Sequence, residues 1–208
     1  MGRVYLVRHG RTEWNALKIF RGRADVDLDE RGWAQARLTA KALSETDLVC
    51  VYTSPLSRSR RTAEILAKGH RLVARVEGDL TDMDYGTWTG RTESEARKEF
   101  PRLFEQWRTA PHTIRFPDGE SLSHVRRRAV ERLREFVRRH GDADIAVVSH
   151  RVVLKVLICE ARGWDNAHFW DVRVDPGGIS TLDADGREFA LLAENDTRHL
   201  KALAPSAA

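Results

Sequence analysis

Three short apolar runs constrain this chain more than any other feature of its sequence. Residues 3–8, 48–52 and 145–148 are rich in valine, leucine, isoleucine or tyrosine, and a polar segment follows each run. Runs of this length and composition are typical of strands that are buried on both faces of a sheet. Helical patterns lie between them, at about 30–42, 57–68, 121–139 and 151–161. Strands that alternate with helices predict an α/β fold, a three-layer α/β/α sandwich around a mostly parallel sheet.

The segment at about 83–120 has a different character. It holds tryptophans, glycines and three prolines between short helical patterns, so we expect an insertion that forms a mainly helical lid over one end of the sheet. A short apolar segment at 72–76 precedes it. Residues 178–193 predict a hairpin that turns at Asp185-Gly186, and residues 205–208 a loose tail. A length of 208 residues suits a single domain, 1–208.

Composition narrows the class of protein. Hydrophobic residues make up 41% of the chain and charged residues 32%, which fits a globular protein and excludes a disordered one. No stretch fits a signal peptide or a membrane span, so we expect a cytoplasmic protein with no membrane partner. Cys50 and Cys159 lie inside apolar runs, without the spacing of zinc ligands, and are expected to be buried thiols.

The net charge of +4 and the pI of about 9.3 favour an anionic ligand. Nucleic acid and small phosphates both meet that description. Arg126, Arg127 and Arg128 are adjacent, but they open a helix among other polar positions, which is typical of a solvated face. Because no nucleic-acid-binding module accompanies the charge, we expect a small phosphorylated metabolite as partner and no nucleic acid.

The residues that follow the apolar runs carry chemical function. Arg8 and His9 end the first run, Ser149 and His150 follow the third, and Arg58 lies shortly after the second. Ligands of open α/β sheets bind at the carboxyl ends of the strands. Three strand ends would therefore bring guanidinium and imidazole groups to one edge, where they could bind a dianion.

These segments resemble, in order, the motifs of the histidine phosphatase superfamily, also called the phosphoglycerate mutase-like superfamily. The resemblance covers about residues 4–160. The opening signature is LVRHGRTEWN at 6–15, and the acid-bearing segment is LTDMDYGTWTG at 80–90. The remaining matches lie at 22–36, 54–63, 117–121 and 147–150.

The resemblance implies a role for each matching residue. His9 would attack phosphorus and become phosphohistidine. Arg8 and Arg58 would hold the phosphoryl oxygens and lower the pKa of His9, and His150 would donate a hydrogen bond to the transferring group. Further contacts to phosphate or substrate are expected from Asn15, Arg21, Gly22 and Arg151.

A carboxylic acid must protonate the leaving alkoxide. The family places this acid four residues before the glycine of a Gly-x-Trp pattern, and counting back from Gly86 gives Asp82. Aspartate stands there in place of the usual glutamate. Asp84 is the competing candidate.

Three arginines depart from the family pattern: Arg11, Arg21 and Arg151. They add positive charge near the expected site, which would favour a substrate with a second acidic group. The other interpretation is that they pair with acidic residues, of which Glu13, Asp25 and Glu120 are candidates. Likewise, the aromatic residues Tyr85, Trp88 and Trp107 either line the mouth of the site or pack in the core.

The sequence thus predicts a phosphatase that hydrolyses small phosphate monoesters through phosphohistidine, without a metal or organic cofactor. The alternative within the family is a 2,3-bisphosphoglycerate-dependent phosphoglycerate mutase, disfavoured by the short lid. A non-catalytic binding module on the same fold is the second alternative. The motifs are compatible with several substrates, namely phosphoserine, α-ribazole phosphate, sugar phosphates and nucleotides. They are also compatible with either a monomer or a homo-oligomer.

Overall fold

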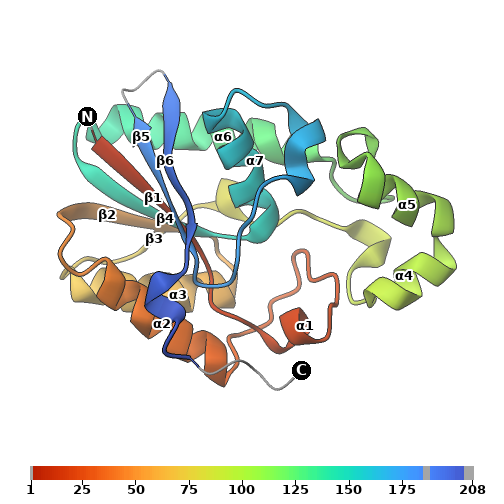
Figure 1. Ribbon diagram of the computed structural model, residues 1–208, viewed down its shortest axis with the longest axis horizontal. Helices are drawn as coiled ribbons and strands as arrows, with labels where there is room; N and C mark the ends of the chain where they lie inside the picture. The colour runs from red at the N-terminus through yellow and green to blue at the C-terminus, as the bar shows by residue number, and fades with distance from the viewer. Residues whose placement is uncertain (1, 185–187, 204–208) are drawn as a thin grey trace.

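A six-stranded sheet forms the centre of the protein (Figure 1), as seen in a computed structural model that describes residues 2–184 and 188–203. The strand order is β3-β2-β4-β1-β5-β6. The first four of these strands are parallel, and β5 and β6 are antiparallel to their neighbours, so the mostly parallel sheet is confirmed. The strands are β1 (Gly2–Arg8), β2 (Leu48–Thr53), β3 (Arg75–Val76), β4 (Asp144–Ser149), β5 (Ile179–Ala184) and β6 (Phe189–Asp196).

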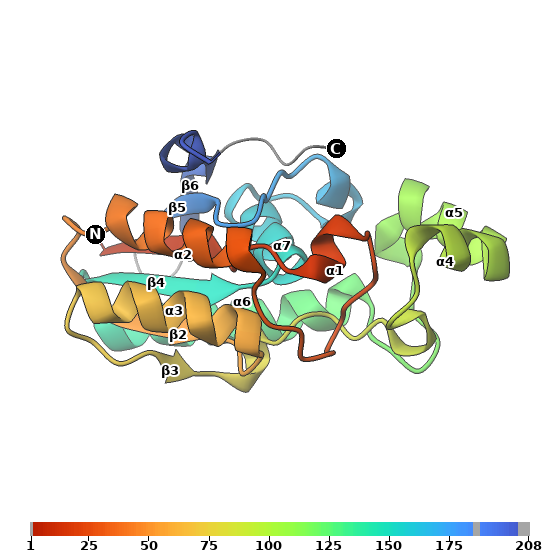
Figure 2. The ribbon, with the colours of Figure 1, turned by 90° about the horizontal axis from the view of Figure 1, so that it is seen from below.

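Helices cover both faces of the sheet, which confirms the three-layer sandwich (Figure 2). One face carries α2 (Glu30–Ala42) and α3 (Ser57–Gly69). The other face carries α6 (Leu122–His140) and α7 (Arg151–Ala161). The shorter helices are α1 (Glu13–Ala16), α4 (Glu93–Glu99), α5 (Pro101–Thr109) and the 3₁₀ turns at Gly78–Leu80, Gly86–Trp88, Pro111–Thr113, Asn166–Trp170 and Arg198–Leu200.

The alternation of side chains along β1 explains why both faces need a cover. Val4 and Leu6 belong to the apolar cluster beneath α6 and α7, whereas Tyr5 and Val7 belong to the cluster beneath α2 and α3. Successive residues of a strand point to opposite faces, so an uninterrupted apolar run requires burial on both sides.

The register of the parallel strands brings their carboxyl ends level. Arg8 of β1 pairs with Ser149 of β4, and Thr53 of β2 pairs with Val148. Backbone hydrogen bonds continue this alignment one residue further, from His9 N–H to the Ser149 carbonyl (3.1 Å) and from Ser54 N–H to the Val148 carbonyl (3.3 Å). The polar residues that end the apolar runs therefore meet at one edge of the sheet.

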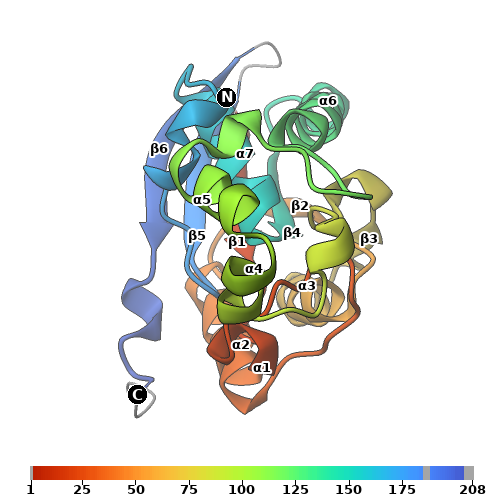
Figure 3. The ribbon, with the colours of Figure 1, turned by 90° about the vertical axis from the view of Figure 1, so that its right-hand side faces the viewer.

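The mainly helical segment 83–120 lies beyond this edge, with α4 and α5 in front of the strand ends in Figure 3. Its two ends are held together at Gly86, which has a φ of +52°. A Cβ at this position would lie 1.9 Å from the Pro117 carbonyl oxygen, so only glycine fits. Trp88 is fully buried within the segment, against Phe100, Phe104 and Phe116.

Some local features differ from the sequence-based expectations. The segment 72–76 contributes only the two-residue strand β3, whose residues are exposed at the sheet edge. Helix α1 was not expected, and the reciprocal bonds between Thr12 and Asn15 stabilise its start. The expected turn at 185–186 and the tail at 205–208 lie outside the described residues. Cys50 and Cys159 are buried free thiols, as predicted. No described helix has the length and apolarity needed to cross a membrane.

A lysine is buried in α7. Lys155 is 3% exposed, and its Nζ donates a hydrogen bond to the Phe169 carbonyl oxygen at 2.9 Å. The same ammonium lies 4.7 Å from the ring centre of Phe169 and 4.8 Å from that of Trp170. Burial, and then the charge of Arg151, lower the pKa of Lys155 to about 7.

Lys155 should make the stability of the protein depend on pH. Between pH 7 and the ordinary pKa of 10.5, the unfolded chain keeps a proton that the folded chain has lost. The free energy of unfolding should therefore rise with pH in this window, by up to about 1.4 kcal/mol per unit, and be insensitive to Lys155 titration below it. Urea unfolding of the wild type and Lys155→Met across this range measures the slope, which the variant should lack. Equal slopes would contradict the prediction.

Candidate active site

Two histidines form the floor of the site at the carboxyl edge of the sheet. His9 follows β1 and His150 follows β4, and both are fully buried. Their ring centres lie 5.2 Å apart. The close approach follows from the level strand ends, because each histidine is the first residue after its strand.

The hydrogen bonding of His9 exposes one ring nitrogen for chemistry. Its Nδ1–H donates to the Gly10 carbonyl oxygen at 2.6 Å, so the lone pair lies on Nε2. That Nε2 is buried and has no hydrogen-bond partner among the described residues. Burial, then Arg58 and Arg8, lower the pKa of His9 well below its ordinary value. The ring is therefore neutral at pH 7, and Nε2 can act as a nucleophile.

His150 has the opposite arrangement. Its Nε2 lies 2.7 Å from Ser54 Oγ, which also accepts a hydrogen bond from Leu56 N–H at 3.2 Å. The Ser54 hydroxyl can donate to Nε2, and the Asp82 carboxylate lies 3.8 Å from Nδ1, so we assign the ring proton to Nδ1. Burial, then Arg58 and His9, lower the pKa of His150 well below its ordinary value, so the ring is neutral. Sequence reasoning gave Ser54 no role, although its place at a strand end was the available signal.

Two buried guanidinium groups lie near His9, and backbone carbonyls hold them. Arg58 is fully buried and donates to the carbonyl oxygens of Ala24 (2.8 Å) and Gly22 (2.9 Å). Arg8 is 5% exposed and donates to the carbonyl oxygen of Val174 at 2.7 Å. The Nε of each arginine has no partner in the described protein. Arg58 also lies 3.4 Å from the Asp82 carboxylate, whereas Arg8 forms no ion pair with a described acid, so the charge of Arg8 is available for an anion.

The structure separates the two candidate acids. Asp82 lines the cavity, with Oδ2 at 3.4 Å from Arg58 Nη2 and 3.8 Å from His150 Nδ1. Asp84 instead accepts a hydrogen bond from Gly86 N–H (2.8 Å) and lies 3.8 Å from Arg23. Asp84 is therefore part of the lid anchor, and Asp82 is the carboxylate within reach of the histidines.

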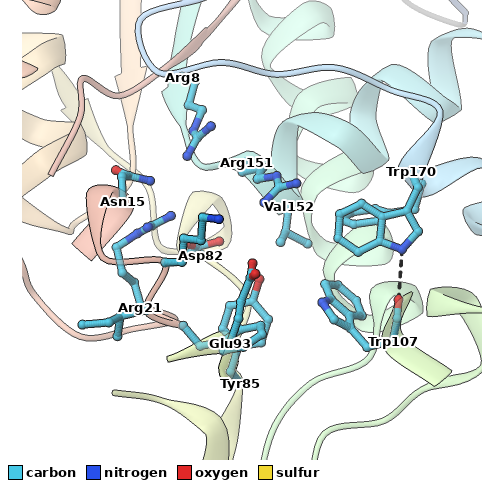
Figure 4. Close-up of a pocket in the computed structure, with 14 residues that line it drawn as sticks. Arg8, Asn15, Arg21, Asp82, Tyr85, Glu93, Trp107, Arg151, Val152 and Trp170 are labelled. Atoms are coloured by element: carbon cyan, nitrogen blue, oxygen red, sulfur yellow. Dashed lines mark hydrogen bonds between the residues drawn. The ribbon is translucent and has the colours of Figure 1, made fainter. Parts of the chain in front are cut away.

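Arg8 and Asp82 of this site line a cavity of about 220 Å³ (Figure 4). Polar side chains line one side of it, and aromatic rings the other. A hydrogen bond of 2.9 Å from Trp170 Nε1 to the Trp107 carbonyl oxygen ties the aromatic side to the lid. The lining includes Arg8, Asn15, Lys18, Arg21, Asp82, Glu93 and Arg151, with Phe20, Tyr85, Trp107, Phe169 and Trp170.

The three unusual arginines have different environments. Arg11 forms an ion pair with Asp29 at 2.7 Å, a partner that differs from the three considered for it. Arg21 and Arg151 both line the cavity and form no ion pair with a described acidic residue. Arg21 Nε is buried without a partner, and the guanidinium of Arg151 lies 5.3 Å from the ring centre of Trp170.

Two of the three proposed acidic partners, Asp25 and Glu120, have other partners. Asp25 accepts hydrogen bonds from Ser57, and Glu120 forms an ion pair with Arg128 at 3.0 Å. Asn15 lines the cavity while its Oδ1 accepts a hydrogen bond from Thr12 N–H, so it also serves the turn. Gly22 contributes a carbonyl that holds Arg58.

The aromatic and basic residues named in the sequence analysis have different locations in the structure. All three aromatic residues belong to the apolar core, and Tyr85 and Trp107 also line the cavity. Arg126 pairs with Glu160 at 2.6 Å, so the basic run at 126–128 is partly neutralised. The described residues contain no group of three or more histidine, cysteine or acidic side chains that could hold a metal ion.

Comparison with known proteins identifies the family to which the chain belongs. The model of the histidine phosphatase superfamily (branch 1) matches residues 4–197. The chain belongs to this superfamily. It is accordingly a phosphatase of the histidine phosphatase type, a hydrolase of phosphate monoesters.

Individual relatives are similar over most of their length. Phosphoserine phosphatase 1 of Hydrogenobacter thermophilus is 36% identical over 200 residues, which cover 96% of this chain and 95% of that protein. The adenosylcobalamin/alpha-ribazole phosphatase of Salmonella typhimurium is 30% identical, over 87% of this chain and 90% of that protein. The solved structure of Bacillus stearothermophilus YhfR superposes with a TM-score of 0.92 at 31% identity and covers 97% of this chain and 100% of that chain.

The environment of His9 generates a direct test of the nucleophile. We expect His9→Ala to lower kcat by at least about 10³-fold, since His9 Nε2 is unpartnered and carries the lone pair, whereas the unpartnered Nδ1 of His150 is assigned the ring proton. Quenching the wild type during turnover without acid and mapping the labelled peptide should place phosphate on His9 Nε2. Circular dichroism of His9→Ala serves as the control for folding. Label on a serine or an aspartate would contradict the assignment.

Proposed function

We propose that this phosphatase hydrolyses small phosphate monoesters that carry a second acidic group, through phosphohistidine on His9 and without metal or organic cofactor. The observation that carries the proposal is the buried, neutral His9 with a free Nε2 beside Arg8 and Arg58. Two further arginines of the same cavity have no acidic partner in the described protein.

In the first step, the Nε2 lone pair of His9 forms a bond to phosphorus while the bond from phosphorus to the ester oxygen breaks. The transferring group resembles metaphosphate, with negative charge on its equatorial oxygens. Arg8, Arg58 and the Nδ1–H of His150 stabilise that charge, because they are already oriented around the point of transfer. A neutral His150 donates a proton in a hydrogen bond without giving it up.

Asp82 acts first as the general acid and then as the general base. In its acid form it gives a proton to the leaving ester oxygen, and an alcohol departs. The resulting carboxylate then takes a proton from water as that water attacks phosphorus. The bond between phosphorus and Nε2 breaks, its electron pair returns to His9, and inorganic phosphate is released. Asp82 ends the cycle protonated, so both groups return to their starting states.

Arg21 and Arg151 support a substrate with a second anionic group. Both lie on the cavity wall beyond the histidines, and neither is neutralised by a described carboxylate. A cavity of about 220 Å³ favours a compact molecule over a nucleotide. The relative named phosphoserine phosphatase 1 makes phosphoserine, whose carboxylate could bind these arginines, the first substrate to test.

The role of Asp82 predicts a dependence on the leaving group. Asp82→Asn should lower kcat/KM for an alkyl phosphate by about 10²–10⁴-fold, because the alkoxide needs a proton. Hydrolysis of p-nitrophenyl phosphate should fall much less, since nitrophenolate leaves unprotonated. Asp84→Asn is the matched control, and its effect should be the smaller one. Equal losses on both substrates would make Asp82 a structural residue.

The role of Arg151 predicts a dependence on the second acidic group. Phosphoserine and phosphoethanolamine differ by one carboxylate. Arg151→Met should lower kcat/KM for phosphoserine by about ten- to a hundredfold, the loss of one charge-assisted contact, while hydrolysis of phosphoethanolamine changes little. Both activities should survive EDTA.

Two outcomes of the same assay would reject the proposal. Equal losses on phosphoserine and phosphoethanolamine would remove Arg151 from substrate recognition. With 3-phosphoglycerate as substrate, efficient formation of 2-phosphoglycerate in the presence of 2,3-bisphosphoglycerate, with little free phosphate, would identify a mutase instead.

A further inference from the structure

A second cavity of about 620 Å³ lies on the other side of Arg8 from the catalytic cavity. The two cavities share Arg8, Asn15, Arg151 and Trp170 as wall residues. The shared residues place them next to each other at the carboxyl edge of the sheet. The further wall of the second cavity comes from Lys155 of α7 and from the segment 171–176 that leads to β5.

The wall of this second cavity carries an excess of positive charge. Five of its side chains are cations, Arg8, Arg11, Arg151, Lys155 and Arg173, and two are acids, Asp171 and Asp175. Arg11 pairs with Asp29, and Arg173 pairs with Asp175 at 2.8 Å. Asp171 lies 3.0 Å from His168. Arg8, Arg151 and Lys155 remain without an ion pair to any described acid.

Two of these cations are held away from water. Arg8 is 5% exposed and its Nε has no partner, and Lys155 is 3% exposed. Lys155 and Arg151 are one helical turn apart on α7, both against the ring of Trp170. Buried cations interact strongly with an anion because little water screens them. An anion in this cavity would relieve the repulsion among the three.

We infer that the second cavity binds an oxyanion, inorganic phosphate foremost, while the catalytic cavity is occupied. The inference depends on the proposed function only for the source of that phosphate. Because Arg8 lines both cavities, released phosphate can pass from one to the other without losing this contact. Two anions that share Arg8 weaken each other, so phosphate held in the second cavity should lower turnover without competing for the same place as substrate.

Lys155 makes the binding depend on pH. Its ammonium form attracts the oxyanion and its neutral form does not, and the two forms interchange near pH 7. Binding should therefore be tighter below pH 7 and accompanied by proton uptake above it. The charged and titratable groups near Lys155 are Arg8 of β1, Arg151 and Cys159 of α7, Glu194 of β6, and Asp171, which lies 3.0 Å from His168 of the 3₁₀ turn at Asn166–Trp170.

Calorimetric titration with sulfate tests the site, since sulfate keeps its charge between about pH 6 and pH 8. We expect two sulfate ions per chain, and the dissociation constant of one should rise by up to about tenfold across this range. Lys155→Met should abolish that pH dependence, and His168→Gln should keep it. Arg173→Glu, at a largely exposed position of the second cavity, should remove one ion. Arg198→Glu makes the same change of charge at an exposed position outside both cavities and should remove none.

Inhibition kinetics give an independent measure. Inorganic phosphate should act as a mixed inhibitor of the wild type and as a purely competitive inhibitor of Arg173→Glu. A single sulfate per wild-type chain, or the same two ions in Arg173→Glu as in Arg198→Glu, would overturn the second site. Displacement of its sulfate by acetate at lower concentration than by phosphate would assign the site to carboxylates instead. If no phosphate ester were hydrolysed, the proposed function would be rejected. The number of sulfate ions bound per chain would still test the second site.

Discussion

The parallel pairing of β1, β4 and β2 is the constraint on which the rest of the site depends. Because Arg8 is level with Ser149, and Val148 with Thr53, the residues that follow each strand are brought to one place by backbone hydrogen bonds alone. His9 and His150 inherit a separation of 5.2 Å from this register. A slip of one residue along either strand would turn a histidine toward the opposite face of the sheet and leave the site without it.

Electrostatics then decides what the assembled groups can do. Arg8 and Arg58 are anchored by the carbonyl oxygens of Val174, Ala24 and Gly22, so their orientation does not cost them their charge. Burial, together with the charge of Arg58 near both rings and of Arg8 near His9, keeps both histidines neutral. The Gly10 carbonyl leaves a free lone pair on His9, and the positions of Ser54 and Asp82 favour the opposite tautomer of His150, with a proton on Nδ1. A nucleophile and a donor thus arise from the same residue type.

Positive charge is distributed unevenly around the two histidines. The basic run at 126–128 is partly neutralised by Glu160 and Glu120, and Arg11 by Asp29. Arg21, Arg151 and Lys155 lack such partners, and they lie on the walls of the two adjacent cavities. Arg126, Arg128 and Arg11 thus have acidic partners, whereas Arg21, Arg151 and Lys155 keep an uncompensated charge where an anion would bind. The ring of Trp170 lies against Arg151 and Lys155, and the ring of Phe169 against Lys155.

The sequence by itself determined the layered α/β architecture, the family, and, to within about two residues, the bounds of β1, β2, β4, α2, α3, α6 and α7. These features can be recognised from residues that are close together in the sequence: the apolar periodicity, and the ordered motifs around His9, Arg58, Asp82 and His150. Tertiary structure alone decided the bond between Ser54 and His150, 96 positions apart, the pairing of Arg11 with Asp29, and the isolation of Arg21 and Arg151. The physical reason is that an ion pair or a tautomer depends on which groups meet across the fold, and many residues in the sequence could have supplied each partner.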